Sequence, residues 1–332
     1  MKRIGIITSG GDAPGMNAAV RAITRQAIAL GLEVWGAQDG FQGLCNDNLV
    51  PLGSRDVGGI LQHGGTLLGT ARCEEFFHAP GRKRAQECLH RYGIDALVLI
   101  GGDGSMAGAQ KLMEEHDTPI VAVPATIDND VPHTDMAIGV DSALNTAVEA
   151  ISKLRDTAAS HQRTFVIETM GRHCGYLALV AGVASGAEAI LVPEFPYDLD
   201  GVADKVRDGM KRGKKHSIIV AAEGIRDQFE LAQFESPAHK VAGYLWDQLG
   251  ETFDVRVTVL GHVQRGGAPT VFDRVLASRM GAAAVQRLQD GEKGIMLGLQ
   301  RNDLVSIPFA DVIGQTRELD EHLMKLAYTI AE

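Results

Sequence analysis

Residues 96–105 read Ala-Leu-Val-Leu-Ile-Gly-Gly-Asp-Gly-Ser. The five residues Ala96–Ile100 are all apolar, and a strand without polar alternation is typically buried on both faces. Helices packed on both sides of a parallel sheet bury a strand in this way. The glycine-rich turn then leads into a helical pattern at Ser105–His116. This stretch predicts an α/β protein with mostly parallel sheets.

The same alternation of strands and helices extends along the chain. Further strands are predicted at Ile4–Thr8, Glu33–Gln38, Ile120–Val123, Thr164–Thr169, Ala189–Val192, Ser217–Ala222 and Val255–Leu260. Further helices are predicted at Met16–Leu30, Arg82–Arg91, Asp141–Ala158 and Phe272–Leu288. The pattern shows no repeat of fixed period and no linker of distinct composition, so composition alone predicts no domain boundary.

Length and composition narrow the functional classes. A chain of 332 residues suggests about two domains, and 45% hydrophobic with 22% charged residues is typical of a globular protein. The formal charge of −10 argues against broad binding to nucleic acid or to an anionic membrane. It leaves room for a local basic pocket that binds a phosphorylated small molecule.

The sequence gives no sign of secretion or membrane insertion. A short strand-like run follows Met1-Lys2-Arg3, and the 15 uncharged residues between Arg172 and Glu188 are too few to span a bilayer. The four cysteines (Cys45, Cys73, Cys88 and Cys174) form no CxxC pair. We therefore expect reduced thiols and a cytoplasmic location.

Two glycine clusters follow predicted strands, where open α/β sheets bind ligands. Gly10–Gly15 precedes the first helix and could hold a phosphate, although a tight turn that begins a helix would look the same. It is not a Walker A loop, because Met16-Asn17 stand where that motif has Lys followed by Ser or Thr. It is not a GxGxxG motif, because Asp12 occupies the position of the second glycine. In Gly101–Ser105, Asp103 could hold Mg²⁺ on a polyphosphate or could simply cap the helix.

An acidic segment, Pro124–Asp130, follows the next strand. If it were extended, Asp128 and Asp130 would point to the same side. Two adjacent carboxylates suit a general base and a partner that supports metal-bound water, whereas the alternative is a solvated acidic turn. Two phosphate-type loops and an acid pair together favour phosphoryl transfer.

Basic residues recur near strand ends. Arg163, Arg172, Arg256 and Arg265 could bind phosphate through two donors each, with His262 beside them and Glu223 available for sugar hydroxyls. Taken singly, any one of these arginines is more simply explained as a surface side chain, and it is their repeated placement at strand ends that favours phosphate binding. A second set of basic residues comprises Arg21, Arg25, Arg55, Arg155 and the run Lys211–His216. The run alone could also be explained as the C-terminus of a helix, where positive side chains complement the helix dipole.

These residues together resemble the phosphofructokinase family, in particular its short bacterial ATP-dependent members. The resemblance rests on GGDAPGMNA, GGDGS, PATIDND, AASHQRT, MGRHCGY and VTVLGHVQRGG, followed by DR and ASRMG, and it extends to about residue 310. It implies two domains, each a mostly parallel sheet flanked by helices, with the active site in the cleft between them. Residues 1–139 and 253–303 would bind the nucleotide, and residues 140–252 and 304–332 the sugar phosphate.

The resemblance also implies residue roles. Asp128 would be the base for the 1-hydroxyl of fructose 6-phosphate, in a catalytic set with Arg172 and Thr126. ATP would be bound by Gly11, Arg72, Cys73, Gly102, Asp103, Gly104 and Ser105, with Asp103 on Mg²⁺. Fructose 6-phosphate would contact Thr126, Asp128, Asp130, Met170, Gly171, Arg172, Glu223, His262 and Arg265, together with Arg163 and Arg256 from a neighbouring subunit.

Shared arginines imply an oligomer, and a homotetramer is usual in this family. An effector site for ADP or phosphoenolpyruvate would use Arg21, Arg25, Arg55, Arg155, Glu188, Arg212, Lys214 and His216. The resemblance thereby favours a binding role for the 211–216 run over the helix C-terminus interpretation.

Two positions depart from the family pattern and bear on the phosphoryl donor. ATP-dependent members commonly carry an aromatic residue at position 73 and Gly at position 125, where this chain has Cys73 and Ala125. Pyrophosphate-dependent relatives carry Asp in place of Gly104 and Lys in place of Ala125. An Asp at position 104 would put negative charge where the ATP α-phosphate lies. We therefore expect ATP as the donor, with pyrophosphate as the alternative.

Two other classes remain as alternatives. A nucleotide sensor without activity would be expected to have lost Asp103, Asp128 or Arg172, and all three are present. A lipid or NAD kinase shares the GGDG loop but has no use for PATIDND and GHVQRGG.

Overall fold

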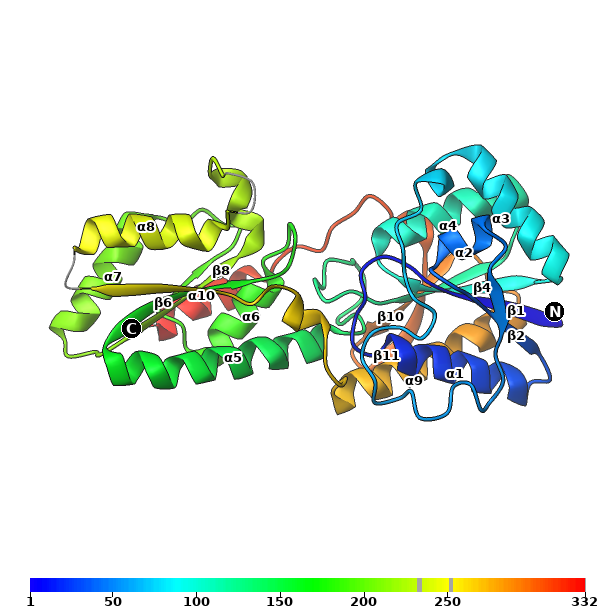
Figure 1. Ribbon diagram of the computed structural model, residues 1–332, viewed down its shortest axis with the longest axis horizontal. Helices are drawn as coiled ribbons and strands as arrows, with labels where there is room; N and C mark the ends of the chain where they lie inside the picture. The colour runs from blue at the N-terminus through cyan, green and yellow to red at the C-terminus, as the bar shows by residue number, and fades with distance from the viewer. Residues whose placement is uncertain (232–234, 251–252, 332) are drawn as a thin grey trace. The chain divides into compact units, whose positions relative to one another are not determined.

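The computed structural model describes residues 1–231, 235–250 and 253–331. The chain divides into two compact units (Figure 1). Unit 1 contains residues 1–127, 131–142 and 265–317, and unit 2 contains residues 128–130, 143–264 and 318–332. None of the helices in these described residues combines the length and the apolar character needed to cross a membrane.

Unit 1 is built on a seven-stranded sheet of order β11-β10-β5-β4-β1-β2-β3. Its five inner strands are parallel, and β3 and β11 pair antiparallel at the two edges. The strands are β1 (Arg3–Thr8), β2 (Glu33–Ala37), β3 (Leu49–Pro51), β4 (Ala96–Gly101), β5 (Ile120–Pro124), β10 (Ile295–Gln300) and β11 (Asp303–Pro308).

Helices cover both faces of this sheet, which explains why every residue of β4 is buried. Leu97 and Leu99 of β4 share a hydrophobic core with α3 and α4, while α1 and α9 pack against each other and α9 lies against β4 and β5. The helical elements are α1 (Met16–Ala29), α2 (Phe41–Cys45), η1 (Glu74–Phe77), α3 (Ala79–Tyr92), α4 (Asp103–His116), α9 (Val271–Gln289) and η4 (Phe309–Asp311).

Unit 2 is built on a four-stranded, fully parallel sheet of order β7-β8-β6-β9. The strands are β6 (Arg163–Thr169), β7 (Ala189–Leu191), β8 (Ser217–Ala222) and β9 (Asp254–Val259). The helical elements are α5 (Val140–His161), which begins in unit 1, α6 (Tyr176–Ser185), α7 (Leu199–Lys211), η2 (Glu223–Gln228), α8 (Pro237–Leu249), η3 (Gly261–Arg265) and α10 (Glu321–Ile330).

Alternate residues of the unit 2 strands belong to different cores. Phe165 and Ile167 of β6 pack in one core with α5, α6 and α10, whereas Val166 packs in a second core with α7 and α8. Because side chains alternate along a strand, these two cores lie on opposite faces of the sheet. The predicted architecture of parallel sheets flanked by helices is confirmed in both units.

Every strand and helix predicted from the sequence is present, with ends that differ by no more than three residues. The elements without a prediction include β10 and β11, which complete the sheet of unit 1. The predicted domain limits differ from the two units at residues 128–130, 140–142, 253–264 and 304–317. The two longest differences lie at residues 253–264 and 304–317. The reason is strand pairing: β9 pairs with β6 in unit 2, and β11 pairs with β10 in unit 1.

The acid of the Asp-Arg pair, Asp273, fixes the start of α5. Its buried carboxylate accepts hydrogen bonds from the backbone N–H of Gly139 (2.9 Å) and of Ser142 (2.8 Å), and from the Ser142 hydroxyl (2.6 Å). Burial raises the pKa of Asp273, while these three donors oppose that shift. Asp273 therefore satisfies helix N–H groups that would otherwise be buried without partners.

Candidate active site

The two glycine loops of unit 1 lie side by side at the carboxyl ends of β1 and β4. The chain passes from β1 to β2 on one side of β1 and later returns to β4 on the other, so the strand order reverses between β1 and β4. Open α/β sheets bind ligands at such a reversal. The loops are joined there by the Ser105 hydroxyl, which donates to the Ser9 hydroxyl at 3.0 Å.

The second loop has free space at Gly104. A Cβ built on Gly102 or Gly104 would meet no atom within 4 Å, and neither residue has a positive φ. Local packing therefore does not require glycine at position 104. The carboxylate of Asp103 in the first turn of α4 makes no hydrogen bond or ion pair within residues 1–231, 235–250 and 253–331. A polyphosphate at the N-terminus of α4 would lie next to backbone N–H groups that can donate to it and next to the carboxylate of Asp103.

The segment that carries Arg72 and Cys73 is fastened to the first loop. The Thr70 hydroxyl donates to the carbonyl of Gly10 (2.7 Å), and the Thr8 hydroxyl donates to the carbonyl of Gly69 (2.7 Å). Arg72 is exposed two residues after Thr70. These contacts bring the predicted ATP-binding residues Gly11 and Arg72 to the end of β1, the same edge of the sheet as the Gly101–Ser105 loop.

Arg265 also reaches the first glycine loop. Its Nη1 donates to the carbonyl of Asp12 at 3.0 Å, and a Cβ on Gly11 would collide with the same guanidinium group. Because the guanidinium is the far end of a flexible side chain and could shift, this contact alone does not require glycine at position 11. The guanidinium predicted to hold a sugar phosphate lies in unit 1, beside a predicted ATP-binding residue.

The acidic segment is bent rather than extended. Asn129 has a φ of +51°, and the chain bends at Ile127 and Asp128. The premise of an extended chain, on which the geometric argument for Asp128 and Asp130 depended, is therefore wrong. Asp128 is only 7% exposed, and it belongs with Asp130 to unit 2, whereas Thr126 belongs to unit 1.

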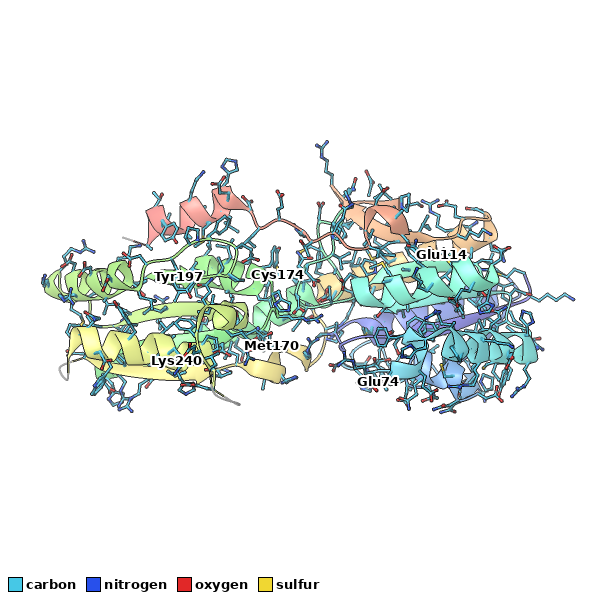
Figure 2. All side chains as sticks on the ribbon, turned by 90° about the horizontal axis from the view of Figure 1, so that it is seen from above. Glu74, Glu114, Met170, Cys174, Tyr197 and Lys240 are labelled. Carbon is cyan, nitrogen blue, oxygen red and sulfur yellow. The ribbon has the colours of Figure 1, made fainter. Side chains whose placement is uncertain are left out.

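The bent acidic segment contributes to the electrostatic environment of the loop that follows β6. Burial raises the pKa of Cys174 to about 12, and the negative charges of Glu194, Asp130 and Asp128 add to this shift. Both acids therefore contribute to the negative electrostatic environment of Cys174. Met170 and Cys174 mark the same end of unit 2 in Figure 2.

The loop after β6 is held in an unusual backbone conformation. Gly171 has a φ of +146°, where a Cβ would collide with the carbonyl of Cys174, and Arg172 has a φ of +56°. Glu223, which follows β8, accepts hydrogen bonds from the N–H of Gly171 (3.1 Å) and of Arg172 (2.6 Å). Glu223 therefore fixes the turn that exposes the Arg172 side chain.

A residue that the sequence analysis missed completes this loop. Gln264 is fully buried in η3 and accepts a hydrogen bond from the N–H of Met170 at 2.8 Å through its Oε1. Loops after the adjacent strands β6, β8 and β9 thus meet at one edge of the unit 2 sheet. The signal was present in GHVQRGG, where a glutamine lies between two candidate phosphate-binding residues.

Arg163 and Arg256 lie at the opposite end of the same strands. Asp254 pairs with Arg163 in the β6–β9 register, accepts a hydrogen bond from Nε of Arg163 (2.6 Å) and forms an ion pair with Nε of Arg256 (2.7 Å). These bonds lower the pKa of Asp254, the bond from Arg163 contributing most. Met170 lies seven positions after Arg163 along the chain, a distance of roughly 20 Å in an extended strand. Asp254 is a second residue that the sequence analysis missed.

The predicted effector residues fall into two groups. In unit 2, Arg155 donates to the carbonyls of Ser185 and Gly186, and Lys214 lies 3.7 Å from the carboxylate of Glu188. The Lys211–His216 run lies at the C-terminus of α7, with Arg212 as the capping residue and His216 just before β8. In unit 1, Arg21, Arg25 and Arg55 make no side-chain hydrogen bond or ion pair within the described residues.

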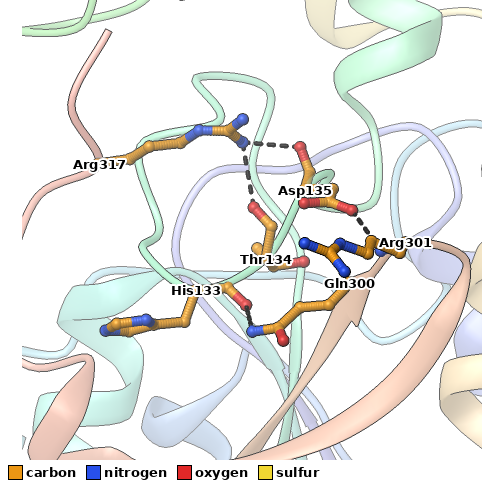
Figure 3. A pocket seen from close by; sticks show the side chains of 6 residues that line it. All are labelled: His133, Thr134, Asp135, Gln300, Arg301 and Arg317. Carbon is orange, nitrogen blue, oxygen red and sulfur yellow. Dashed lines mark hydrogen bonds between the residues drawn. The ribbon is translucent and has the colours of Figure 1, made fainter. Parts of the chain in front are cut away.

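One cavity of about 320 Å³ in unit 1 contains none of the predicted site residues. It is lined by His133, Thr134, Asp135, Gln300, Arg301 and Arg317 (Figure 3). Arg317 donates to the carbonyls of Thr134 (3.0 Å) and Asp135 (2.7 Å), and the carboxylate of Asp135 accepts the N–H of Arg301 (2.8 Å). These bonds hold the turn between β10 and β11 against the 133–135 loop.

Comparisons with known proteins agree with this geometry. The sequence model of the family described as Phosphofructokinase matches residues 3–288. Proteins named ATP-dependent 6-phosphofructokinase from Thermotoga neapolitana and Halalkalibacterium halodurans are each 50% identical to this chain over 331 residues, which cover 100% of both chains.

Solved structures show the same fold. Pichia pastoris phosphofructokinase in the T-state matches with a TM-score of 0.86 and 38% identity, over 99% of this chain and 36% of that chain. A pyrophosphate-dependent phosphofructokinase from Nitrosospira multiformis matches with a TM-score of 0.87 over 96% of this chain and 86% of that chain, and its 22% identity shows the fold alone. The family match and the full-length relatives together show that the chain belongs to the phosphofructokinase family.

Proposed function

We propose that this protein transfers the γ-phosphate of ATP to the 1-hydroxyl of fructose 6-phosphate, giving fructose 1,6-bisphosphate and ADP. The observation that carries this proposal is the loop after β6, where Glu223 accepts the N–H groups of Gly171 and Arg172 and so fixes the exposed Arg172, in the unit that also contains the buried Asp128. An acid, an exposed arginine and a hydroxyl-binding carboxylate suit a sugar-phosphate acceptor. The relatives that are 50% identical over their full length support ATP as donor.

In the proposed reaction Asp128 accepts the proton of the 1-hydroxyl as its oxygen attacks the phosphorus. Arg172 stabilises the charge that spreads over the transferred phosphoryl group, and Thr126 orients the reacting groups. Met170, Gly171, Asp130 and Glu223 bind the sugar, with Glu223 accepting from its hydroxyls. His262 and Arg265 hold the 6-phosphate.

On the nucleotide side, Gly11, Arg72, Cys73 and Gly102 to Ser105 bind ATP. Asp103 is the residue that would hold Mg²⁺, and no group of three or more His, Cys, Asp or Glu in the described residues could hold a metal ion. A single carboxylate fits Mg²⁺, which usually takes its other ligands from phosphates and water. When bound, the ion neutralises the negative charge of the phosphates.

The two separate groups of arginines support an oligomer. Arg163 and Arg256 lie roughly 20 Å along the strands from Arg172, so one phosphosugar cannot reach both groups within unit 2. Arg163 and Arg256 of one copy would instead bind the 6-phosphate in the active site of a neighbouring copy. We therefore propose that the protein is a homotetramer. The exposed edge strand β9, with Val259 45% exposed, is consistent with a contact between copies.

We further propose that ADP or phosphoenolpyruvate binds as an effector. In unit 2 the basic residues Arg155 and Lys214 gather near Glu188, at the amino ends of β7 and β8. Two cationic side chains in one region favour a phosphorylated ligand. Arg21, Arg25 and Arg55 of unit 1, and Arg212 and His216, complete the proposed set.

We expect Asp254→Asn to raise the KM for fructose 6-phosphate by about 3- to 10-fold while kcat stays within about twofold. Asp254 holds both arginines through Nε, which orients their remaining N–H groups for a phosphate. Steady-state kinetics with saturating ATP measure both constants. The control is Asp247→Asn, which changes an exposed acid of α8 in the same unit. A KM equal in both variants would contradict the positioning role.

The proposed function is tested by the initial rate of fructose 1,6-bisphosphate formation from fructose 6-phosphate and Mg²⁺. One reaction contains ATP and a parallel reaction contains pyrophosphate. We expect turnover with ATP alone, because Gly104 leaves space beside the glycine loop. Turnover with pyrophosphate alone would overturn ATP as the donor, and turnover with neither would overturn the sugar-phosphate kinase.

A further inference from the structure

Two cysteine side chains of unit 1 are in contact. The Sγ of Cys73 lies 3.8 Å from the Sγ of Cys45, and both cysteines are free thiols. Cys45 is the last residue of α2, and Cys73 immediately precedes η1. These two short elements are packed together by the rings of Phe41 and Phe76, which stack with centroids 4.0 Å apart. The contact between the sulfurs is therefore part of a built interface.

We propose that Cys45 and Cys73 form a reversible disulfide that controls nucleotide binding. A disulfide has a sulfur–sulfur length of about 2.05 Å, so the two sulfur atoms must approach by about 1.8 Å. Cys73 lies at the end of a loop, immediately before η1, and a small movement of that loop closes this gap. The proposal rests on the proposed function, because that function places Arg72 and Cys73 at the ATP site.

The two thiols differ in access to solvent, which sets the order of the chemistry. Cys45 is 8% exposed and its Sγ donates to the carbonyl of Gly81 at 3.4 Å, whereas Cys73 is half-buried. Burial raises the pKa of Cys45 to about 12, and the neighbouring Cys73 adds to that shift. Cys73 is therefore the sulfur that an oxidant reaches first.

A peroxide is the class of oxidant that this arrangement suits. The Cys73 thiol reacts with hydrogen peroxide to give a sulfenic acid and water, so the sulfur is oxidised as the O–O bond breaks. The Cys45 sulfur then displaces the hydroxyl of the sulfenic acid, which leaves as a second water with the Cys45 proton. In total, two thiols and one peroxide give one disulfide and two waters, and a dithiol reductant reverses the cross-link.

The cross-link would weaken ATP binding through the neighbour of Cys73. Arg72 precedes Cys73 directly, and the Thr70–Gly10 hydrogen bond ties the same segment to the first glycine loop. Drawing Cys73 towards α2 therefore displaces Arg72 from the position that the reduced chain gives it. The residues proposed to bind the sugar in unit 2 are not part of this segment.

The experiment treats the full-length protein with stoichiometric hydrogen peroxide and maps cross-linked peptides by mass spectrometry. Calorimetry then measures the Kd for ATP and for fructose 6-phosphate before and after treatment, and again after dithiothreitol. We expect a Cys45–Cys73 cross-link, a Kd for ATP raised at least about tenfold, an unchanged Kd for fructose 6-phosphate and full recovery on reduction. Cys45→Ser should retain the reduced Kd for ATP and lose the response.

The control is Cys88→Ala, which removes another buried thiol and should keep both the cross-link and the response. Cys45→Ala serves as a second variant if serine destabilises the buried position. A Cys45–Cys88 cross-link, no cross-link, or a Cys45–Cys73 cross-link without a change in ATP binding would each overturn the proposal. Failure of the proposed function looks different: reduced protein that binds ATP but phosphorylates no sugar leaves the cross-link result intact.

Discussion

Asp128→Asn is expected to lower kcat by about 10²- to 10⁴-fold, the range that a positioned general base contributes. Asparagine has nearly the same shape as aspartate but cannot accept the proton of the attacking hydroxyl. Because Asp128 is only 7% exposed, water does not readily take its place. The KM values for both substrates should change much less than kcat, since Arg172 and Glu223 are unaltered.

Steady-state kinetics at saturating substrates measure this loss, and the unfolding midpoint of the variant shows whether the fold is intact. Asp117→Asn is the matched control, because Asp117 is a strongly exposed acid paired with Lys293 on unit 1. It should keep kcat within about twofold, as surface ion pairs contribute little. If Asp128→Asn retained more than about a tenth of kcat, Asp128 would not be the base.

Gly104→Asp should lower kcat/KM for ATP by at least about 100-fold, because a like charge placed against a bound anion costs several kcal/mol. A Cβ at this position meets no protein atom within 4 Å, so the substitution should leave the unfolding midpoint unchanged. The loss should therefore come from repulsion of the nucleotide phosphates and from bulk in their path. The KM for fructose 6-phosphate should stay unchanged.

Gly104→Asn separates charge from size, since the two side chains have the same shape. We expect a smaller loss for Asn than for Asp, with the difference diminishing as salt concentration rises. Equal losses in the two variants would mean that bulk alone acts at this position. Full ATP activity in Gly104→Asp would show that the loop after β4 does not approach the nucleotide.

The extent to which the sequence predicts the fold depends on how local the signal is. The run Ala96–Ile100 predicts a buried parallel strand because burial on both faces leaves no polar alternation. The hairpin of β10 and β11 lacked a comparable signal. Its turn places Arg301 (φ +50°) and Asn302 (φ +76°) in the left-handed region, where the usual signature is Asn-Gly or Asp-Gly.

The site was predictable where single residues carry the chemistry and less so where contacts arise between distant segments. Asp128, Arg172 and Glu223 were identified as candidates from the sequence, and in the structure all three belong to unit 2. Asp254 was missed because its partner Arg163 is 91 residues away and only the β6–β9 register joins them. The bend at Asn129 was missed because the segment was treated as an extension of the preceding strand, although Asp and Asn are common turn residues.

The sheet of unit 1 also constrains how the chain can be made and divided. Residues 1–127 supply β1 to β5, yet β10 and β11, which continue the sheet beyond β5, come from residues 295–308. During synthesis on the ribosome, one edge of β5 therefore has no partner strand until the residues of unit 2 and then β10 have been synthesised. No contiguous fragment contains unit 1 alone. Gene truncation or domain exchange at a single point would leave an open sheet edge, whereas removal of residues 143–264 as an insert would keep all seven strands.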